Sequence, residues 1–315
     1  MIKFAPKTKK GLLLRVIFIL VVGLFSVTWW YARMAGIQLA DGRESARLDW
    51  CEINVLFCGD AMHQRLHDVP FVTIEKSISS DVQLSGVAVE SATGMGVILV
   101  HPFRGIHQQM MPLAAGLYDK GVGSIALDLR GHGKSSGDVI TFGPNEMRDL
   151  QAAYNVLVDD MRVSADRVAI IGWGYGGSMA MLYAARNPNV KVIVADSMYA
   201  NFDRHTIANI TDTSPALSFI ALYALEKKLK LNLEDHAPEN ILMDLEGRSV
   251  LALIAAKDEM YSAKQSTLMF KHSESFVELW QEPEYQHLQF YTENPILYVE
   301  RVTQFIVDKL EDLDG

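Results

Sequence analysis

Ile170-Ile171-Gly172-Trp173-Gly174-Tyr175-Gly176-Gly177-Ser178 is the stretch of sequence that decides the fold. Its apolar start is typical of a buried strand, and four glycines then follow within six residues. A chain that turns sharply from a strand into a helix brings its backbone segments very close together, and small residues at two-residue spacing permit that approach. The stretch therefore predicts a strand, a tight turn with Gly174 at its apex, and a helix.

Strand and helix patterns alternate on both sides of this turn. Period-two alternation predicts antiparallel edge strands at 72–75 and 82–89. Further strands are predicted at 97–100, 123–127, 168–171, 190–195, 250–254 and 276–280. Helices are predicted at 109–118, 145–161, 178–186 and 295–310, the second of them capped by Asn145. This alternation predicts an α/β fold with a doubly wound, mostly parallel sheet.

One segment, between Asp203 and Glu246, interrupts the alternation. It contains no strand pattern and a single apolar helix around 216–225. We expect this insertion, at about 203–246, to lie over the strand ends as a helical cap.

The pattern of charged and apolar residues over 1–31 predicts a cytoplasmic tail and a transmembrane signal anchor. Four lysines precede an apolar segment from Gly11 to Tyr31 that is interrupted only by Arg15. The segment reaches the ~20 residues that a helix needs to span a bilayer, and aromatic residues 29–31 stand where an interfacial belt belongs. Lysines before the span place the N-terminus in the cytoplasm and the rest of the chain outside it, in a periplasmic, extracellular or lumenal space. A cleaved signal peptide and a cytosolic domain are the alternatives.

Residues 32–68 mix charges, glycine and cysteine without a sustained period, which predicts a juxtamembrane linker to a domain at 69–315. Cys51 and Cys58 are the only cysteines, and in an oxidising compartment we expect them to form a small disulfide loop, with two free thiols as the alternative. No His and Cys spacing completes the ligand set of a metal site, so we expect neither a metal nor a cofactor.

Composition and charge limit the function classes. The 315 residues are 49% apolar and 21% charged, which suits one globular α/β domain beyond the N-terminal segment. The net charge is −9, and no basic stripe occurs beyond the first 15 residues. Because neutralising nucleic-acid phosphates requires clustered lysine and arginine, we expect no nucleic-acid partner.

Two further motifs precede Gly174 in the sequence. Residues 128–135 read Asp-Leu-Arg-Gly-His-Gly-Lys-Ser, and residues 101–105 read His-Pro-Phe-Arg-Gly. With these motifs, the chain over roughly residues 70–310 resembles α/β hydrolases of the esterase, lipase and serine-aminopeptidase type. In that family a G-x-S-x-G turn between a strand and a helix carries the nucleophile.

The resemblance implies a place for each catalytic group. Gly174 occupies the position of the family's serine nucleophile. Asp258 follows the strand at 250–254 and matches the family's acid. His287 follows the last strand and matches the family's histidine. The order nucleophile, acid, histidine is that of the family. The backbone N–H groups of Phe103 and Tyr175 would form the oxyanion hole.

Three departures from the family pattern stand out. Gly174 has no side chain, so it cannot attack a carbonyl. Pro102 replaces the usual glycine of the oxyanion turn, and Gln286 replaces the small residue often found before the histidine. The resemblance therefore does not extend to covalent catalysis.

Other polar residues near these motifs are expected to be structural. Asp128, Arg130 and His132 would organise their loop, His101 would stabilise a turn, and Ser178 would pack within the helix. Asp258 and His287 would also be explained as a relic hydrogen-bonded pair. The remaining histidines are expected at the surface: His63, His67, His107, His205, His236 and His272.

Three functions remain open from the sequence. The first is a membrane-tethered pseudo-hydrolase that binds a ligand or a protein at the former active site. The second is an enzyme without a covalent step, in which His287, polarised by Asp258, activates water for ester hydrolysis; cofactor-free lyase or oxygenase chemistry is a variant. The third is a serine hydrolase with a displaced nucleophile, Ser178 or Ser197. The apolar cap and the anchor favour a small acyl or lipid ligand; a protein partner is also compatible, but no residue pattern identifies one.

Overall fold

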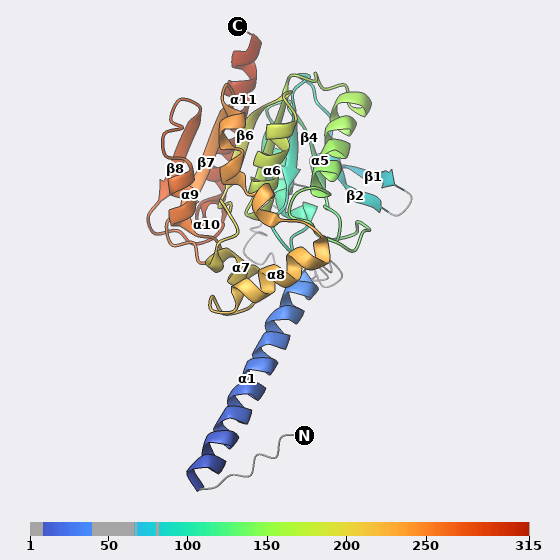
Figure 1. Cartoon of the computed structure of the whole chain (residues 1–315). Helices are drawn as coiled ribbons and strands as arrows, with labels where there is room; N and C mark the ends of the chain where they lie inside the picture. Colours follow the sequence, from blue (N-terminus) through green and yellow to red (C-terminus); the bar gives the residue numbers. More distant parts are fainter. Residues whose placement is uncertain (1–8, 40–65, 67, 80–81, 315) are drawn as a thin grey trace.

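The computed structural model describes residues 9–39, 66, 68–79 and 82–314 of the chain. The predicted disulfide between Cys51 and Cys58 lies outside the described residues, as do His63 and His67. A layered α/β domain carries one long helix, α1 (Lys9–Leu39), which leaves the domain at the end where helices α7 and α8 lie (Figure 1).

One mixed sheet of eight strands forms the centre of the domain, in the order β1-β2-β4-β3-β5-β6-β7-β8. The pairs β1–β2 and β2–β4 are antiparallel, and all other neighbours are parallel. This confirms the predicted doubly wound sheet with an antiparallel edge. The strands are β1 (Val72–Ser79), β2 (Val82–Val89), β3 (Gly96–Val100), β4 (Gly123–Leu127), β5 (Val168–Trp173), β6 (Val190–Asp196), β7 (Ser249–Ala255) and β8 (Val277–Glu282).

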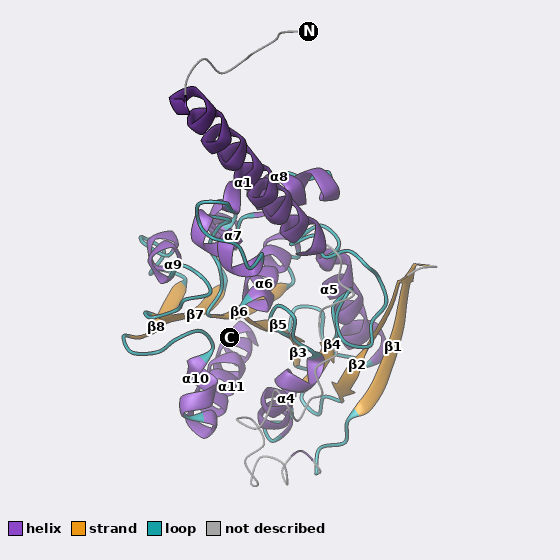
Figure 2. Cartoon of the chain, turned by 90° about the horizontal axis from the view of Figure 1, so that it is seen from below, coloured by secondary structure: helices purple, strands orange, loops and turns teal. Residues whose placement is uncertain are grey.

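Helices cover both faces of the sheet. Figure 2 shows α5, α6 and α9 on one face and α4, α10 and α11 on the other. Successive strand residues point to opposite faces, so Ile170 belongs to the core under α5 and α6, whereas Ile171 belongs to the core under α4 and α11. These helices are α4 (Met111–Tyr118), α5 (Glu146–Asn155), α6 (Tyr175–Arg186), α9 (Ala263–Met269), α10 (Gln289–Glu293) and α11 (Pro295–Glu311).

Two predicted helix starts differ from the structure. The helix expected from residue 109 begins as a 3₁₀ turn at His107–Met110, and α4 follows it. Asn145 does not cap α5 with its side chain, because its backbone is already helical (φ −82°, ψ −39°). The loop before α5 is instead held by the buried Glu146 carboxylate, which accepts hydrogen bonds from the N–H groups of Thr141 and Gly143 at 2.8 Å each.

The insertion between β6 and β7 forms the cap, as expected, but with two helices rather than one. They are α7 (Arg204–Ile210) and α8 (Ser218–Leu229), followed by short 3₁₀ turns between Leu233 and Leu245. Asp203 begins α7 by accepting a hydrogen bond from the Thr206 N–H at 2.8 Å.

Helix α1 continues to Leu39, past residue 32, where the linker was predicted to begin. Ala32 is fully buried, and Gly36 lies against the backbone of Ala221 in α8. Packing against the cap therefore extends the helix where the sequence shows no sustained period.

The turn from β5 into α6 is as tight as its glycines predict. A Cβ atom on Gly172 would lie 2.1 Å from the Gly176 carbonyl oxygen, and one on Gly176 would lie 2.4 Å from the carbonyl oxygen of Val100 in β3. Real Cβ atoms do not approach backbone this closely, so neither position accepts a larger residue without displacing α6 or β3.

We expect Gly176→Ala to lower the free energy of unfolding by about 1–3 kcal/mol, because the added methyl group overpacks against rigid backbone rather than a mobile side chain. Urea denaturation of the detergent-solubilised chain, followed by circular dichroism, measures the change. An unaltered midpoint and slope would contradict the close approach of α6 to β3.

Candidate active site

Gly174 forms the apex of the turn between β5 and α6, at the carboxyl end of a central strand. Its backbone has φ +55° and ψ −117°, a conformation that residues with a side chain rarely adopt. The Gly174 N–H donates to the carbonyl oxygen of Asp196, the last residue of β6, at 2.7 Å. The turn is therefore fixed to the neighbouring strand.

Asp258 and His287 form a hydrogen-bonded pair. The His287 Nδ1 donates to Asp258 Oδ2 at 2.7 Å, and the other oxygen, Oδ1, accepts from the N–H groups of Met260 and Tyr261 at 2.8 and 2.9 Å. The Asp258 side chain is 4% exposed, whereas that of His287 is 22% exposed. The carboxylate is thus fixed by its own turn, and the imidazole remains open to a ligand.

The imidazole of His287 faces Gly174. A Cβ atom placed on Gly174 would lie 3.1 Å from His287 Nε2 and 3.6 Å from the ring of Tyr261. With Nδ1 donating to Asp258, the lone pair on Nε2 is available at the position where a side chain on residue 174 would begin. The structure brings the three predicted residues together, while their catalytic roles stay a prediction.

Phe103 and Tyr175 supply the two predicted oxyanion donors. Phe103 lies in the loop after β3, and Tyr175 is the first residue of α6. Within the described part of the chain, neither backbone N–H donates a hydrogen bond. Pro102 is tolerated in this loop because the turn uses its carbonyl oxygen, which accepts from the Gly105 N–H at 2.9 Å.

A family model described as "Alpha/beta hydrolase family" matches residues 97–300, which include the whole of this site. The chain belongs to the alpha/beta hydrolase family.

Solved structures of alpha/beta hydrolases share the fold. The Pyrococcus furiosus esterase Pf2001 superposes with a TM-score of 0.63 and 21% identity, covering 78% of this chain and 95% of the esterase. The alpha/beta hydrolase GrgF from a Penicillium species gives a TM-score of 0.62 and 15% identity, covering 77% of this chain and 100% of that protein. At these identities the likeness concerns the fold alone.

Two protein sequences match parts of the chain. A multifunctional-autoprocessing repeats-in-toxin protein of Vibrio vulnificus is 28% identical over 171 residues, which cover 50% of this chain and 3% of that protein. An Escherichia coli protein described as an uncharacterized 31.7 kDa protein in the traX-finO intergenic region is 26% identical over 136 residues, 42% of this chain and 48% of that protein. The chain thus matches less than half the length of either relative.

The two serines considered as displaced nucleophiles are both engaged in this alpha/beta hydrolase. The Ser178 Oγ is buried and donates to the carbonyl oxygen of Tyr199 at 3.0 Å. The Ser197 Oγ donates to Asp196 Oδ1 at 2.8 Å and accepts from the Leu288 N–H at 3.2 Å. Neither hydroxyl is hydrogen-bonded to His287.

Asp196 is the supporting residue that the sequence analysis missed. Its carboxylate is fully buried and accepts from Ser197 and from the Tyr298 hydroxyl, at 2.8 Å each, while its carbonyl oxygen holds Gly174. Burial raises the pKa of Asp196 to about 6, despite the lowering effect of both hydrogen bonds. Its signal in the sequence was a lone acid at the carboxyl end of an apolar strand, the edge where ligands bind in parallel sheets.

The loop after β4 is structural, as the sequence predicted. Its buried Arg130 forms a two-pronged ion pair with Asp149 of α5, with closest atoms 2.5 Å apart. Asp128 accepts from the N–H and the Nδ1 of His107 at 2.7 and 2.9 Å, so His107 is buried and the surface prediction for it was wrong. Burial would raise the pKa of Asp128, but the contacts from His107 outweigh it and hold the pKa below its usual value.

His101 and His132 are buried and neutral. His101 donates from Nδ1 to the Pro102 carbonyl and accepts the Leu129 N–H on Nε2 at 2.9 Å, so it links the loops after β3 and β4. Burial lowers the pKa of His101 to about 3 and that of His132 to about 4. Neither ring is therefore a base for a ligand at Gly174.

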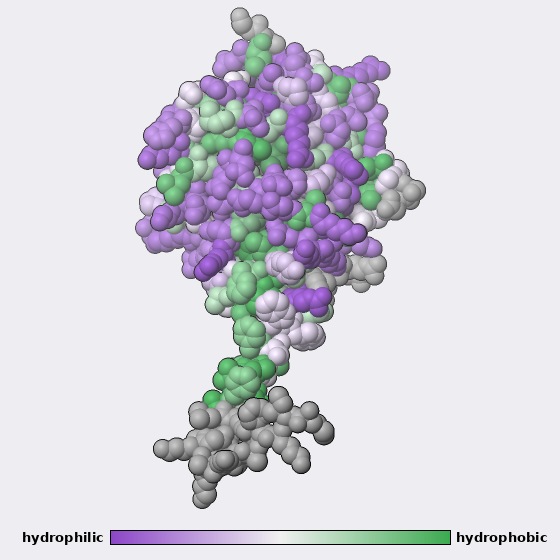
Figure 3. All heavy atoms as spheres, in the orientation of Figure 1, coloured by the Kyte–Doolittle hydropathy of each residue, from purple (hydrophilic) through white to green (hydrophobic). Residues whose placement is uncertain are grey.

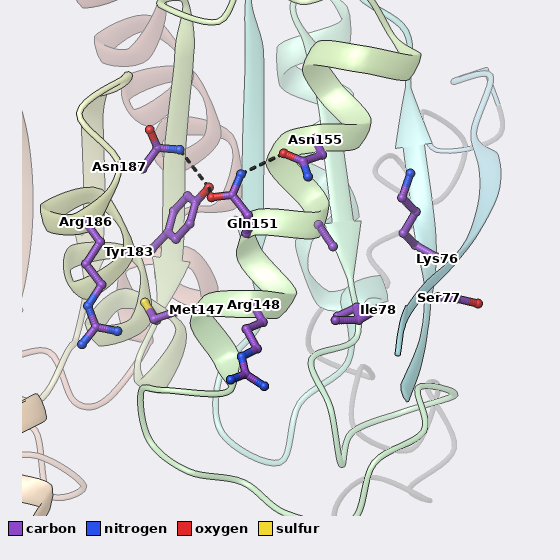
Figure 4. Close-up of a pocket in the computed structure, with 11 residues that line it drawn as sticks. Lys76, Ser77, Ile78, Met147, Arg148, Gln151, Asn155, Tyr183, Arg186 and Asn187 are labelled. Atoms are coloured by element: carbon purple, nitrogen blue, oxygen red, sulfur yellow. Dashed lines mark hydrogen bonds between the residues drawn. The ribbon is translucent and has the colours of Figure 1, made fainter. Parts of the chain in front are cut away.

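A separate groove of about 490 Å³ lies between β1 and the helices α5 and α6 (Figure 4). Tyr183 and Gln151 are hydrogen-bonded across it at 3.1 Å, and Arg148 and Arg186 lie along its margin. None of the predicted site residues lines this groove. Among the residues that the structure describes, no group of three or more His, Cys, Asp or Glu is placed to hold a metal ion.

Each of the two buried histidines, taken by itself, makes the fold less stable in acid, whereas the raised pKa of Asp196 acts in the opposite direction. A folded-state pKa below the ordinary ~6.5 means that only the unfolded chain takes up the proton, so stability is lost as the pH falls from ~6.5 towards ~4. His132→Phe keeps a ring in place and removes one of the two groups. As the pH falls through this range, the free energy of unfolding of the variant should therefore decrease less steeply than that of the unmodified chain. The difference between the two slopes should be up to ~1.4 kcal/mol per pH unit.

Urea denaturation at several pH values between 7.5 and 4.5 gives the pH dependence of the free energy of unfolding for both proteins. A change in stability that the substitution causes equally at every pH does not affect this comparison. If the free energy of unfolding has the same dependence on pH in His132→Phe and in the unmodified chain, then His132 binds its proton equally well in the folded and unfolded states, which would contradict the prediction.

Proposed function

We propose that this alpha/beta hydrolase-fold protein is membrane-anchored and binds a small acyl-type molecule at the Gly174–His287 site without forming an acyl-enzyme. The observation that carries the proposal is Gly174 itself. The residue at the apex of the turn, opposite the His287 imidazole, has no side chain that could attack a carbonyl.

The ligand class follows from what the site retains. The free N–H groups of Phe103 and Tyr175 suit a carbonyl or carboxylate oxygen, since oriented backbone donors bind such oxygens in a site that excludes water. The hydrogen bonds made by Ser178 and Ser197 leave neither hydroxyl paired with the histidine, which weighs against a displaced nucleophile. This arrangement therefore suits a ligand that is bound without a covalent bond.

Hydrolysis by activated water is the second candidate, and the Asp258–His287 pair favours it. Water in the space beside Gly174 would lose a proton to His287 Nε2 while its oxygen attacks the ester carbonyl. The imidazolium, stabilised by Asp258, would then protonate the departing alkoxide, so the products are an acid and an alcohol. An oxyanion hole and binding alone can leave a rate ~10³–10⁴ above the uncatalysed one when a member of a triad is lost.

Helix α1 supports the membrane location. Residues 17–36 are long and apolar enough to cross a membrane, and their side chains are almost all exposed. The contact of Gly36 with Ala221 lies at the end of this segment and would be lost if the segment were removed as a signal peptide. We therefore propose an uncleaved single-pass anchor, with its N-terminus in the cytoplasm and the domain outside.

Restoring the missing hydroxyl tests the site. We expect Gly174→Ser to create esterase activity on short activated acyl esters, because its Cβ would lie 3.1 Å from His287 Nε2. The Oγ on that Cβ is then within reach of the imidazole, and the partly exposed ring can shift by a few tenths of an ångström to accept it. The same variant should react with a fluorophosphonate probe, whereas the unmodified protein should not. Release of p-nitrophenol and in-gel fluorescence measure the two results.

Gly174→Ala is the matched control, because it carries the same backbone strain without a hydroxyl. Adding His287→Ala to Gly174→Ser should abolish both signals. Slow turnover by the unmodified protein that also requires His287 would favour the water-activating enzyme over the binding module. Fluorophosphonate labelling of the unmodified protein at Ser178 or Ser197 would overturn the non-covalent proposal.

Topology is tested with reporters fused after Gly315. Alkaline phosphatase folds only in an oxidising space, so we expect its fusion to be active and a β-galactosidase fusion at the same residue to be inactive. N-terminal sequencing of the purified fusion should find α1 still attached. The reverse reporter pattern, or a mature chain that begins after Tyr31, would refute the proposed anchor.

A further inference from the structure

Cap helix α8 lies between the core of the domain and the end of α1. Ala221 and Leu225 are fully buried in the main hydrophobic core. A Cβ atom on Gly36 would lie only 2.2 Å from the Ala221 carbonyl oxygen, so the two helix backbones touch. The position of α8 relative to α1 is therefore fixed by direct backbone packing.

The outer face of α8 exposes two aromatic rings and then two lysines. Phe219 and Tyr223 are each 56% exposed, and the Lys227 Nζ lies 5.5 Å from the centre of the Tyr223 ring. Lys230 continues this exposed stripe at the end of the helix. Residues spaced by three or four share one face of a helix, and Phe219 and Tyr223, each two residues from Ala221, lie on the side opposite to it. We call residues 219, 223, 227 and 230 the outer stripe.

Helix α1 shows how near α8 lies to the candidate membrane span. Gly36 comes five residues after Tyr31, the last aromatic residue of the apolar span, which is ~7.5 Å along a helix axis. A bilayer has a headgroup layer of ~5–8 Å on each side of its hydrocarbon core. The domain-side end of the candidate span, Ile17–Gly36, is therefore in direct contact with α8, the helix that carries both rings.

The chemistry of the stripe matches that layer. Aromatic side chains concentrate at membrane interfaces, and lysine side chains are attracted to anionic headgroups. In Figure 3 the apolar surface of α1 continues onto the adjoining end of the domain, where α7 and α8 lie in Figure 1. Phe219 and Tyr223 are thus large, water-exposed aromatic rings on the cap helix that packs against the end of α1.

We propose that the outer stripe of α8 rests on the bilayer, with Phe219 and Tyr223 among the headgroups and Lys227 and Lys230 against anionic lipid. The partner is the lipid surface in which α1 is inserted. This second contact would add to the backbone packing of α1 against α8 in holding the domain in one orientation above the membrane.

The cap also connects this surface to the candidate site. The Asn209 side chain in α7 donates to the carbonyl oxygens of Glu259 and Met260, next to Asp258. Asp212, just after α7, pairs with Arg104 at 3.4 Å, next to Phe103. Contact of α8 with lipid therefore acts on a cap that touches both halves of the site.

Photo-crosslinking of the full chain in vesicles of phosphatidylcholine and phosphatidylglycerol tests the contact. p-Benzoylphenylalanine is placed at position 219 or 223 and, as a matched control, at Leu313, an exposed apolar residue (47%) at the opposite end of the molecule. Mass spectrometry counts lipid adducts. We expect about tenfold more lipid adducts at 219 and 223 than at 313, because aromatic positions at headgroup depth touch lipid continuously.

Equal adduct yields at all three positions, or crosslinks from 219 and 223 to protein instead of lipid, would overturn the proposal. Replacing phosphatidylglycerol by phosphatidylcholine should lower the yield at 223 more than it lowers the yield at 313, since Lys227 lies against the same ring. The result is independent of the chemistry at Gly174, because no step of the experiment requires a ligand at the site.

Discussion

The close approach of α6 to β3 is the constraint on which the rest of the domain depends. Gly172 and Gly176 leave no space for a Cβ atom, so the chain can reverse from β5 into α6 within one turn. That turn places Gly174 at the carboxyl edge of the sheet and brings the Tyr175 N–H to the start of a helix, where the dipole favours anionic oxygen. Two cores, one on each face of the sheet, then hold β5 in the middle of the domain.

The site is assembled from three loops that meet at this edge. Asp196 connects them, because its carbonyl oxygen binds the turn at Gly174 and its carboxylate orients Ser197, which in turn holds the Leu288 N–H beside the histidine. Asp258 is also held by two backbone donors, which means that its position does not require His287. The pair is thus kept in register with Gly174 by ordinary loop hydrogen bonding. An absent hydroxyl removes the nucleophile without removing the scaffold that would position it.

Helix α1 and the cap belong to one structural unit. The backbone contact between Gly36 and Ala221 couples the end of α1 to α8, and α7 carries that coupling to the loops after β3 and β7. In these proposals, an acyl molecule would bind at the Gly174–His287 site while the outer surface of the cap rests on lipid. The proposed non-covalent binding and the proposed membrane contact are therefore compatible uses of the same cap.

The sequence by itself determined the succession of strands and helices along the chain and the tight turn, because these depend on local periodicity and small residues. The resemblance to α/β hydrolases then implied Gly174, Asp258 and His287 as the site residues, and the sequence showed that the first of them has no side chain. Tertiary structure decided what depends on distant partners. It buried His107 against Asp128, gave Asp196 its supporting place, and extended α1 through Gly36, because a close contact with α8 stabilises helix where the local sequence shows no period. Such contacts join residues tens to hundreds of positions apart, and no local pattern records them.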